Sequence, residues 1–199
     1  MKNIINIAIV GLGQVGIYLL NELNTKKKDI ELKTGKKINV VAVSAKNIKK
    51  ERQFKVDNKI FFKNPLEIFN KKKVDILFEA IGLADGISKK VVETALKKKI
   101  HVITPNKALI SKHGNYLAKI AELNNVNLEF EASVAGGIPI LRTIKEGLAT
   151  NKISKVYGIL NGTTNYILSE MENSNQNFKD VLKKAQKLGY AEPGNSKFD

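Results

Sequence analysis

Three glycines near the N-terminus have the spacing of a phosphate-binding turn. Gly11, Gly13 and Gly16 form a G-x-G-x-x-G pattern between an apolar run of strand length and a segment with helical spacing. In that context the first glycine permits a tight turn, the second lets the backbone reach a pyrophosphate, and the third lets helix and strand pack closely. The free amides at the helix N-terminus would then bind the anion. We predict a dinucleotide site here, with a plain glycine turn as the alternative.

The residues after the second predicted strand bear on which dinucleotide is bound. An NAD site normally carries an acidic residue at this position to hold the ribose 2′-hydroxyl. The chain instead has Ser44, Ala45 and Lys46, and the basic residues Lys49 and Arg52 follow. These side chains could meet a 2′-phosphate, so the sequence favours NADP and leaves NAD possible. Ordinary loop lysines in a lysine-rich chain are nearly as good an explanation.

Lys107 is the lysine best placed for catalysis. It follows Thr-Pro-Asn just past the predicted strand 100–104, and ligands of open α/β sheets bind at the carboxyl ends of the strands. A lysine there can donate a proton or a hydrogen bond to a carbonyl oxygen. The chain has 34 lysines and arginines, so position and not residue type distinguishes this one. His101, at the other end of the strand, is more simply structural, and His113 is expected on a helix surface.

A carboxylate beside a run of small residues indicates a cation site. Glu131 lies at the end of the last strand predicted in the first unit, 126–132, and within FEASVAGGIPI, residues 130–140. Small residues let backbone carbonyls converge. One carboxylate with several carbonyls is the ligand set of a hard cation such as Na⁺ or Ca²⁺, and not of zinc. A tight interdomain crossover with Glu131 in a salt bridge explains the same residues equally well.

The elements that must position these groups alternate between strand and helix. Strands are predicted at 4–10, 38–44, 74–82, 100–104 and 126–132, and helices after the glycine turn and at 65–70, 87–99 and 108–124. Such alternation is typical of βαβ units with right-handed crossovers. We therefore expect an α/β fold, a Rossmann-like doubly wound parallel sheet over residues 1–132, with loops at 25–37 and 45–59.

Residues 133–199 begin a second unit with a different pattern. Helices are predicted at 138–148, 163–173 and 177–189, and a strand is predicted at 153–160. This mixture suggests the start of an α+β catalytic domain that is incomplete where the chain stops.

Composition excludes several classes of protein. The chain has no cysteine, so disulfides, a thiolate nucleophile and cysteine-ligated metals are excluded, as expected of a cytoplasmic protein. No stretch has the uninterrupted apolar length of a membrane span. The net charge of +15 invites a nucleic-acid partner. We expect none, because Arg52 and Arg142 are the only arginines and the lysines are dispersed, without the arginine forks or aromatic stacking of such surfaces.

Five blocks of sequence together resemble the homoserine dehydrogenases. GLGQVG, TPNKALI, FEASVAGGIPI, GILNGTTNYIL and AQKLGYAEP occur in the order and at the spacing of that family, across essentially the whole chain. The resemblance implies NAD(P)-dependent interconversion of L-homoserine and L-aspartate 4-semialdehyde by hydride transfer. This reaction lies on the route to threonine, methionine and isoleucine. The resemblance also implies a homodimer for the full-length protein.

The resemblance implies roles for individual residues. It implies contacts with the cofactor at Gly11, Leu12, Gly13, Gln14, Val15, Gly16, Lys107 and Gly189, beside the contact at Lys46 that the residues after the second strand predict. Lys107 would also lie near the reacting centre, as the catalytic residue. Glu192 would bind the amine of homoserine. Sodium would be held by Glu131 and by the backbone oxygens of Val134, Gly136 and Ile138.

The chain departs from the family pattern after the block GYAE. The turn reads PGNSKFD, and the sequence stops at Asp199 before the family's G-x-D and a following lysine. In the family these supply a substrate-binding aspartate and a proton-transferring lysine, so residues 1–199 are expected to be inactive alone. The alternatives are a dinucleotide-binding module without turnover, or a related amino-acid dehydrogenase.

Overall fold

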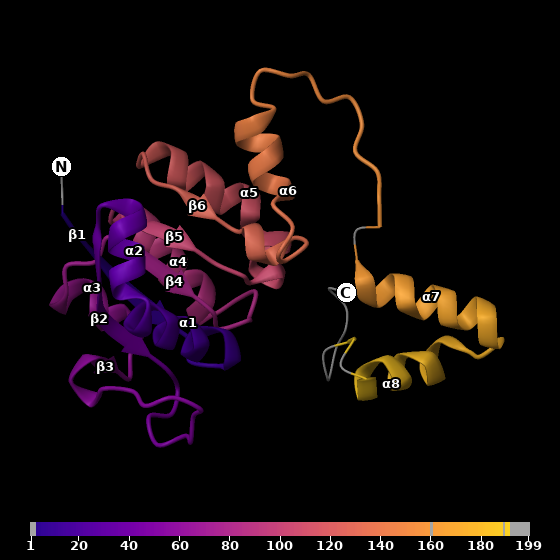
Figure 1. Ribbon diagram of the computed structural model, residues 1–199, viewed down its shortest axis with the longest axis horizontal. Coiled ribbons are helices and arrows are strands. Elements are labelled where there is room, and N and C mark those ends of the chain that lie inside the picture. The colour runs from indigo at the N-terminus through magenta and orange to yellow at the C-terminus, as the bar shows by residue number, and fades with distance from the viewer. Residues whose placement is uncertain (1–2, 160, 189, 192–199) are drawn as a thin grey trace. The chain divides into compact units, whose positions relative to one another are not determined.

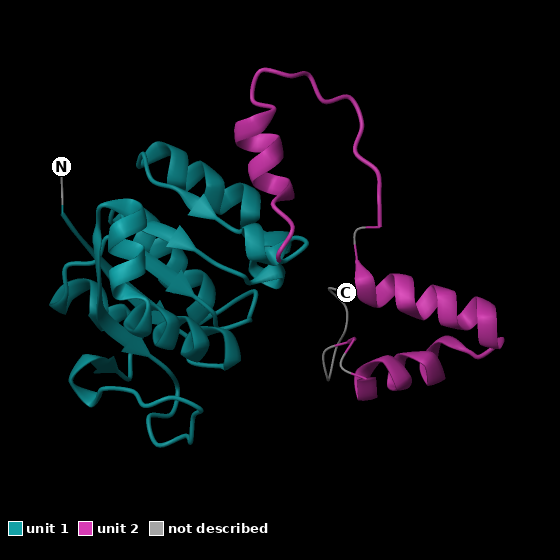
Figure 2. Cartoon of the chain, viewed as in Figure 1, with its two compact units in different colours: residues 1–136 teal, residues 137–199 magenta. Residues whose placement is uncertain are grey.

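The computed structural model describes residues 3–159, 161–188 and 190–191. The chain divides into two compact units, residues 1–136 and 137–199 (Figure 2). Each unit is described by itself below. The functional boundary between residues 132 and 133 stays a prediction.

The first unit is built on a sheet of six parallel strands (Figure 1). The strands are β1 Ile4–Val10, β2 Lys37–Ser44, β3 Phe61–Phe62, β4 Ile76–Glu79, β5 His101–Ile103 and β6 Leu128–Glu129. Their order across the sheet is β3-β2-β1-β4-β5-β6. This is the order of doubly wound dinucleotide-binding sheets, and it reverses direction between β1 and β4. The predicted Rossmann-like fold class is confirmed.

The helices of the first unit lie between the strands along the chain. They are α1 Gln14–Thr25, α2 Lys27–Thr34, α3 Ile68–Lys71, α4 Ile87–Lys97 and α5 Lys107–Leu123, with 3₁₀ turns η1 Asn58–Ile60, η2 Pro65–Glu67 and η3 Glu131–Ser133. Side chains alternate along β1 between two cores. Ile7 and Ile9 pack with α1, whereas Ala8 and Val10 pack with residues of α3, α4 and α5. Helices therefore cover both faces of the sheet, which explains why β1 reads as a continuous apolar run.

The lysine-rich segment 25–37 contains α2, so the prediction of a loop there was wrong. None of the residues of α2 is buried. A helix without a buried face has no apolar periodicity, which is the feature that reveals a helix in a sequence. The helix ends at Gly35, which has the left-handed conformation that glycine adopts without strain (φ 66°).

The regular elements among the described residues of the second unit are helices, and residues 148–159 are irregular. Residues Ile140–Arg142 (α6) continue into a π turn at Thr143–Gly147 (η4), and α7 Gly162–Ser174 and α8 Phe178–Leu188 follow. α7 and α8 pack through Ile167, Val181 and Ala185. The strand predicted at 153–160 was wrong: residues 153–159 contain no strand, and residue 160 lies outside the described residues. A strand needs a hydrogen-bonded neighbour, and the described part of this unit supplies none.

No helix among the described residues is long and apolar enough to cross a membrane.

Candidate dinucleotide-binding site

The glycine turn lies at the carboxyl ends of β1, β2 and β4. Gly11 has φ 99°, and its amide donates to the carbonyl of Ser44 at the end of β2 (2.9 Å). A Cβ atom at Gly11 would lie 2.3 Å from the carbonyl oxygen of Ala80, just after β4. Both the backbone conformation and the close approach exclude a side chain here. The turn therefore sits where the strand order reverses.

The other two glycines differ sharply in the space around them. A Cβ atom at Gly16 would lie 1.9 Å from the carbonyl oxygen of Gly11, whereas one at Gly13 would meet nothing within 4 Å. Gly13 is also the N-cap of α1. Because glycine has no side chain, it cannot cap the first amides of the helix, and the first turn carries no acidic residue that could do so. Open space therefore lies before a helix N-terminus with unpaired amides, which is an environment suited to a pyrophosphate.

The other predicted contacts in the turn have different surroundings. Gln14 and Val15 are exposed in the first turn of α1, where a ligand could reach them. The side chain of Leu12 is buried in the core with Ile17 and Leu20. Leu12 can therefore contribute only its backbone to a cofactor site.

Arg52 holds the loop after β2 against the glycine turn. Its Nε donates to the carbonyl of Leu12 (3.3 Å), and its two terminal nitrogens donate to the carbonyls of Asn47, Ile48 and Lys50. Four of the five N–H groups of a guanidinium are thus used within the chain. Arg52, considered above as a phosphate ligand, is better suited to position the loop. Lys46 and Lys49 on the same loop are exposed.

Lys107 is the first residue of α5 and is half-buried. The preceding Asn106 caps the helix, because its side-chain oxygen accepts from the amide of Leu109 (3.1 Å). A cation at a helix N-terminus opposes the helix dipole. Helix stability therefore does not explain a lysine at this position, at the edge of the sheet that carries the glycine turn.

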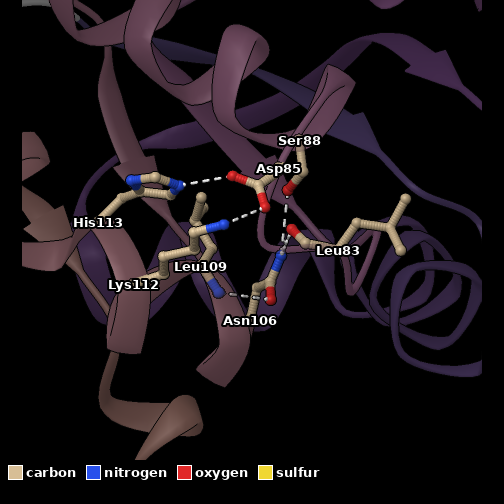
Figure 3. Close-up of polar contacts among 7 residues, drawn as sticks. All are labelled: Leu83, Asp85, Ser88, Asn106, Leu109, Lys112 and His113. Carbon is tan, nitrogen blue, oxygen red and sulfur yellow. Dashed lines mark hydrogen bonds and ion pairs between the residues drawn. The ribbon is translucent and has the colours of Figure 1, made fainter. Parts of the chain in front are cut away.

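A buried carboxylate at the same edge was missed by the sequence reasoning. Glu79 ends β4 and is fully buried, and it accepts hydrogen bonds from Ile81, Ser88, Thr104 and Asn106. The signal that could have found it is a glutamate ending an otherwise apolar strand, level with Thr-Pro-Asn at the end of the next strand. Asn106 also donates to the carbonyl of Leu83 (2.9 Å), which belongs to the loop after β4 (Figure 3).

An exposed carboxylate, Asp85, also ties this loop to α5, where it contacts the exposed Lys112 and the largely buried ring of His113. Asp85 lies between Lys112 (2.5 Å) and His113 (2.8 Å) of the helix (Figure 3). Hydrogen bonds from Lys112 and then from His113 lower the pKa of the Asp85 carboxyl below its ordinary value. The other histidine is structural, as predicted: His101 begins β5, and its Nδ1 accepts from the amide of Asn127 (3.0 Å).

The predicted cation ligands span the boundary between the two units. Glu131 begins the 3₁₀ turn η3, and Val134 and Gly136 follow in the same unit, whereas Ile138 belongs to the second. The carbonyl of Ile138 accepts from the amide of Ile140 (2.8 Å). Among the described residues there is no group of three or more His, Cys, Asp or Glu side chains that could hold a metal. Any cation here would depend on backbone oxygens.

Gly189 and Glu192 lie outside the described residues.

Two models of known protein families match the chain. Residues 11–131 match the family model described as the NAD-binding domain of homoserine dehydrogenase, and residues 139–199 match the one described as homoserine dehydrogenase. The chain belongs to the homoserine dehydrogenase family. The resemblance inferred from its motifs is confirmed.

Relatives and solved structures agree with this membership. The chain is 42% identical to a homoserine dehydrogenase of Neisseria gonorrhoeae over 94% of its length and 43% of the relative. It is 38% identical to that of Helicobacter pylori over 100% of its length and 46% of the relative. A crystal structure of a homoserine dehydrogenase from Thiobacillus denitrificans matches with a TM-score of 0.83 and 37% identity, covering 98% of this chain and 45% of that one. The chain thus spans less than half the length of each of these three homoserine dehydrogenases.

A more distant structure shares the fold alone. A hyperthermophilic archaeal homoserine dehydrogenase in complex with NADPH matches with a TM-score of 0.76 at 24% identity, covering 98% of this chain and 64% of that one.

Proposed function

We propose that this chain is the cofactor-binding part, with the start of the catalytic part, of an NAD(P)-dependent homoserine dehydrogenase. The proposed protein interconverts L-homoserine and L-aspartate 4-semialdehyde and works as a homodimer in the cytoplasm. The observation that carries the proposal is the glycine turn at the switch point of a family-matched sheet, with open space before the N-terminus of α1.

The residues present fit a nicotinamide dinucleotide. The amides at the start of α1 would bind the pyrophosphate, and the loop after β2 would meet the adenosine ribose. The bound cofactor supplies or accepts the hydride. Lys107, at the carboxyl edge of the sheet, would stabilise negative charge that develops on the carbonyl oxygen of the aldehyde. Gly189 would add a cofactor contact, and Glu192 would bind the amine of homoserine.

NADP is the preferred cofactor in this proposal. β2 ends at Ser44, which is buried, and Ala45 and Lys46 follow, so no carboxylate occupies the position that would repel a 2′-phosphate. Lys46 and Lys49 are exposed, and Arg52 holds their loop beside Leu12 of the glycine turn. The loop is thus fixed by one basic residue while two others face solvent where a phosphate could reach them.

An assay with L-homoserine tests both the reaction and the cofactor. Full-length protein should reduce NADP⁺ only when L-homoserine is present. Its kcat/KM with NADP⁺ should be at least equal to that with NAD⁺, and about tenfold or more higher if one charged contact is made to the 2′-phosphate. Lys46→Ala should lower the ratio of the two kcat/KM values. Lys28→Ala, an exposed lysine of α2, should leave the ratio unchanged. Cofactor binding without homoserine-dependent reduction would leave only a dinucleotide-binding module.

A monovalent cation, with Na⁺ the best candidate, is the second ligand we propose. The donor set is one carboxylate, Glu131, with the backbone oxygens of Val134, Gly136 and Ile138, and oxygen donors of this kind suit a hard cation. The backbone reverses sharply here, with positive φ at Ala135 (51°) and Gly137 (87°).

Replacing Glu131 with leucine should abolish any dependence of activity on monovalent cations. Leucine is one bond shorter than glutamate and carries no oxygen, so the cation would lose the one charged ligand of this donor set. The measurement is initial rate against NaCl concentration, with choline chloride holding the ionic strength constant. Glu129→Leu, which changes the glutamate of β6, serves as the control. An unchanged sodium response in Glu131→Leu would favour the salt-bridge explanation of this residue.

A further inference from the structure

We propose that Glu79 is a positioning residue whose buried carboxylate fixes the loop 80–86 and the start of α5, which flank the nicotinamide half of the dinucleotide site. This inference rests on the function proposed above. It assigns to Glu79 a role in cofactor geometry, and not merely in the stability of the sheet.

The carboxylate of Glu79 accepts hydrogen bonds from four residues in different segments of the chain. Its Oε1 accepts from the amide of Ile81 (2.8 Å) and from the hydroxyl of Ser88 (2.7 Å) in the first turn of α4. Its Oε2 accepts from the hydroxyl of Thr104 (2.6 Å) just after β5. The side-chain amide of Asn106 lies 3.3 and 3.4 Å from the two oxygens. One group therefore joins the ends of β4 and β5 to the starts of α4 and α5.

The hydrogen bonds around Glu79 use its carboxyl group as an acceptor. The hydroxyl of Ser88 accepts from Asn106 Nδ2 (3.0 Å), and the hydroxyl of Thr104 accepts from the Asn106 amide (3.0 Å). Both hydroxyl hydrogens are then directed at Glu79, which acts only as an acceptor. Every donor to Glu79 is neutral. A buried carboxyl group is costly unless such donors satisfy it, and an apolar residue would fill a purely structural site without that cost.

Asn106 connects the Glu79 carboxylate to the loop 80–86 and to the start of α5. Its Nδ2 donates to the carbonyl of Leu83 in the loop, while its Oδ1 caps α5 through Leu109 (Figure 3). Lys107 is the next residue. Ala80 begins this loop, and Gly11 of the glycine turn packs against its carbonyl group. The Glu79 network therefore fixes both the loop beside the glycine turn and the backbone that carries Lys107.

The position of this network across the sheet identifies the half of the cofactor concerned. In a doubly wound sheet the dinucleotide crosses the switch point, with the adenosine ribose at the end of the second strand. That strand is β2, on one side of β1. Glu79 ends β4 and Asn106 follows β5, and both strands lie on the other side of β1. The nicotinamide half thus faces the part of the edge that Glu79 organises.

The test compares the intact cofactor with its adenosine half. Full-length wild-type protein and Glu79→Gln are titrated calorimetrically with NADPH and with adenosine 2′,5′-bisphosphate. Glutamine keeps the shape but replaces one acceptor with a donor, so the loop and the start of α5 lose their fixed position. We expect the Kd of NADPH to rise about tenfold or more, the effect of losing a charged hydrogen bond, while that of the adenosine half stays within about twofold. Glu122→Gln, an exposed glutamate of α5, should change neither.

Each outcome decides between distinct conclusions. Equal weakening of both ligands in Glu79→Gln, or no weakening of NADPH, overturns the positioning role. If Glu79→Gln does not fold, Ser88→Ala and Thr104→Val remove one donor each, and they must weaken NADPH selectively or the proposal fails. Wild-type protein that binds neither ligand would instead contradict the proposed function.

Discussion

Replacement of Lys107 with alanine should lower the kcat of the full-length protein with L-homoserine by about a hundredfold or more. Hydride transfer between a nicotinamide and an aldehyde changes the charge on the carbonyl oxygen, and a nearby ammonium stabilises that charge in the transition state. The fold should be unaffected, because Lys107 is half-buried at the sheet edge and opposes the dipole of α5. Steady-state kinetics and a thermal melt measure the two effects.

The control for Lys107→Ala is a lysine elsewhere on the same helix. Lys119 is exposed on α5, and Lys119→Ala should retain wild-type kcat and KM. The pattern of the kinetic constants then decides the role of Lys107. A variant with near-normal kcat and a raised KM would make Lys107 a binding contact and not a catalytic group.

The central fold was predictable because its signals are local. β1 is a largely apolar run with both faces buried, and the glycines follow it directly, with Gly11 packed against Ala80 and Gly16 against Gly11. α2 gave no such signal, since none of its residues is buried. The segment 153–160 has strand-like residues, but a strand also depends on a partner, and local composition carries no information about whether one is present.

The site was predictable residue by residue but not as a network. The glycine turn and Lys107 follow from position relative to the predicted strands. Glu79 did not, because its donors lie from two to 27 residues away, and only the parallel pairing of β4 with β5 brings them together. Arg52 likewise looked like a phosphate ligand, since the sequence does not show that backbone carbonyls already use its guanidinium.

Gly16 and Gly13 should respond differently to substitution, because Gly16 is closely packed and Gly13 is proposed to contact the cofactor. Gly16→Ala should lower the free energy of unfolding by about 1–3 kcal/mol or more, because the new Cβ would lie 1.9 Å from a backbone oxygen that cannot move aside cheaply. Gly13→Ala should change that free energy by less than about 1 kcal/mol, since its φ of −73° suits alanine and nothing lies within 4 Å.

Gly13→Ala should instead weaken the binding of the cofactor, although it has little effect on stability. The methyl group of Gly13→Ala would enter the open space before the N-terminus of α1 and keep the pyrophosphate from the backbone amides. We expect the Kd of NADPH to rise at least about tenfold, the effect of losing a charge-assisted hydrogen bond. Calorimetric titration and urea denaturation of the same preparations give both quantities. Gly114→Ala, in the middle of α5, where the new Cβ would lie 3.4 Å from Ile110, is the matched control because it is remote from the turn in the chain. Full cofactor affinity in a folded Gly13→Ala variant would show that the pyrophosphate does not lie against this helix.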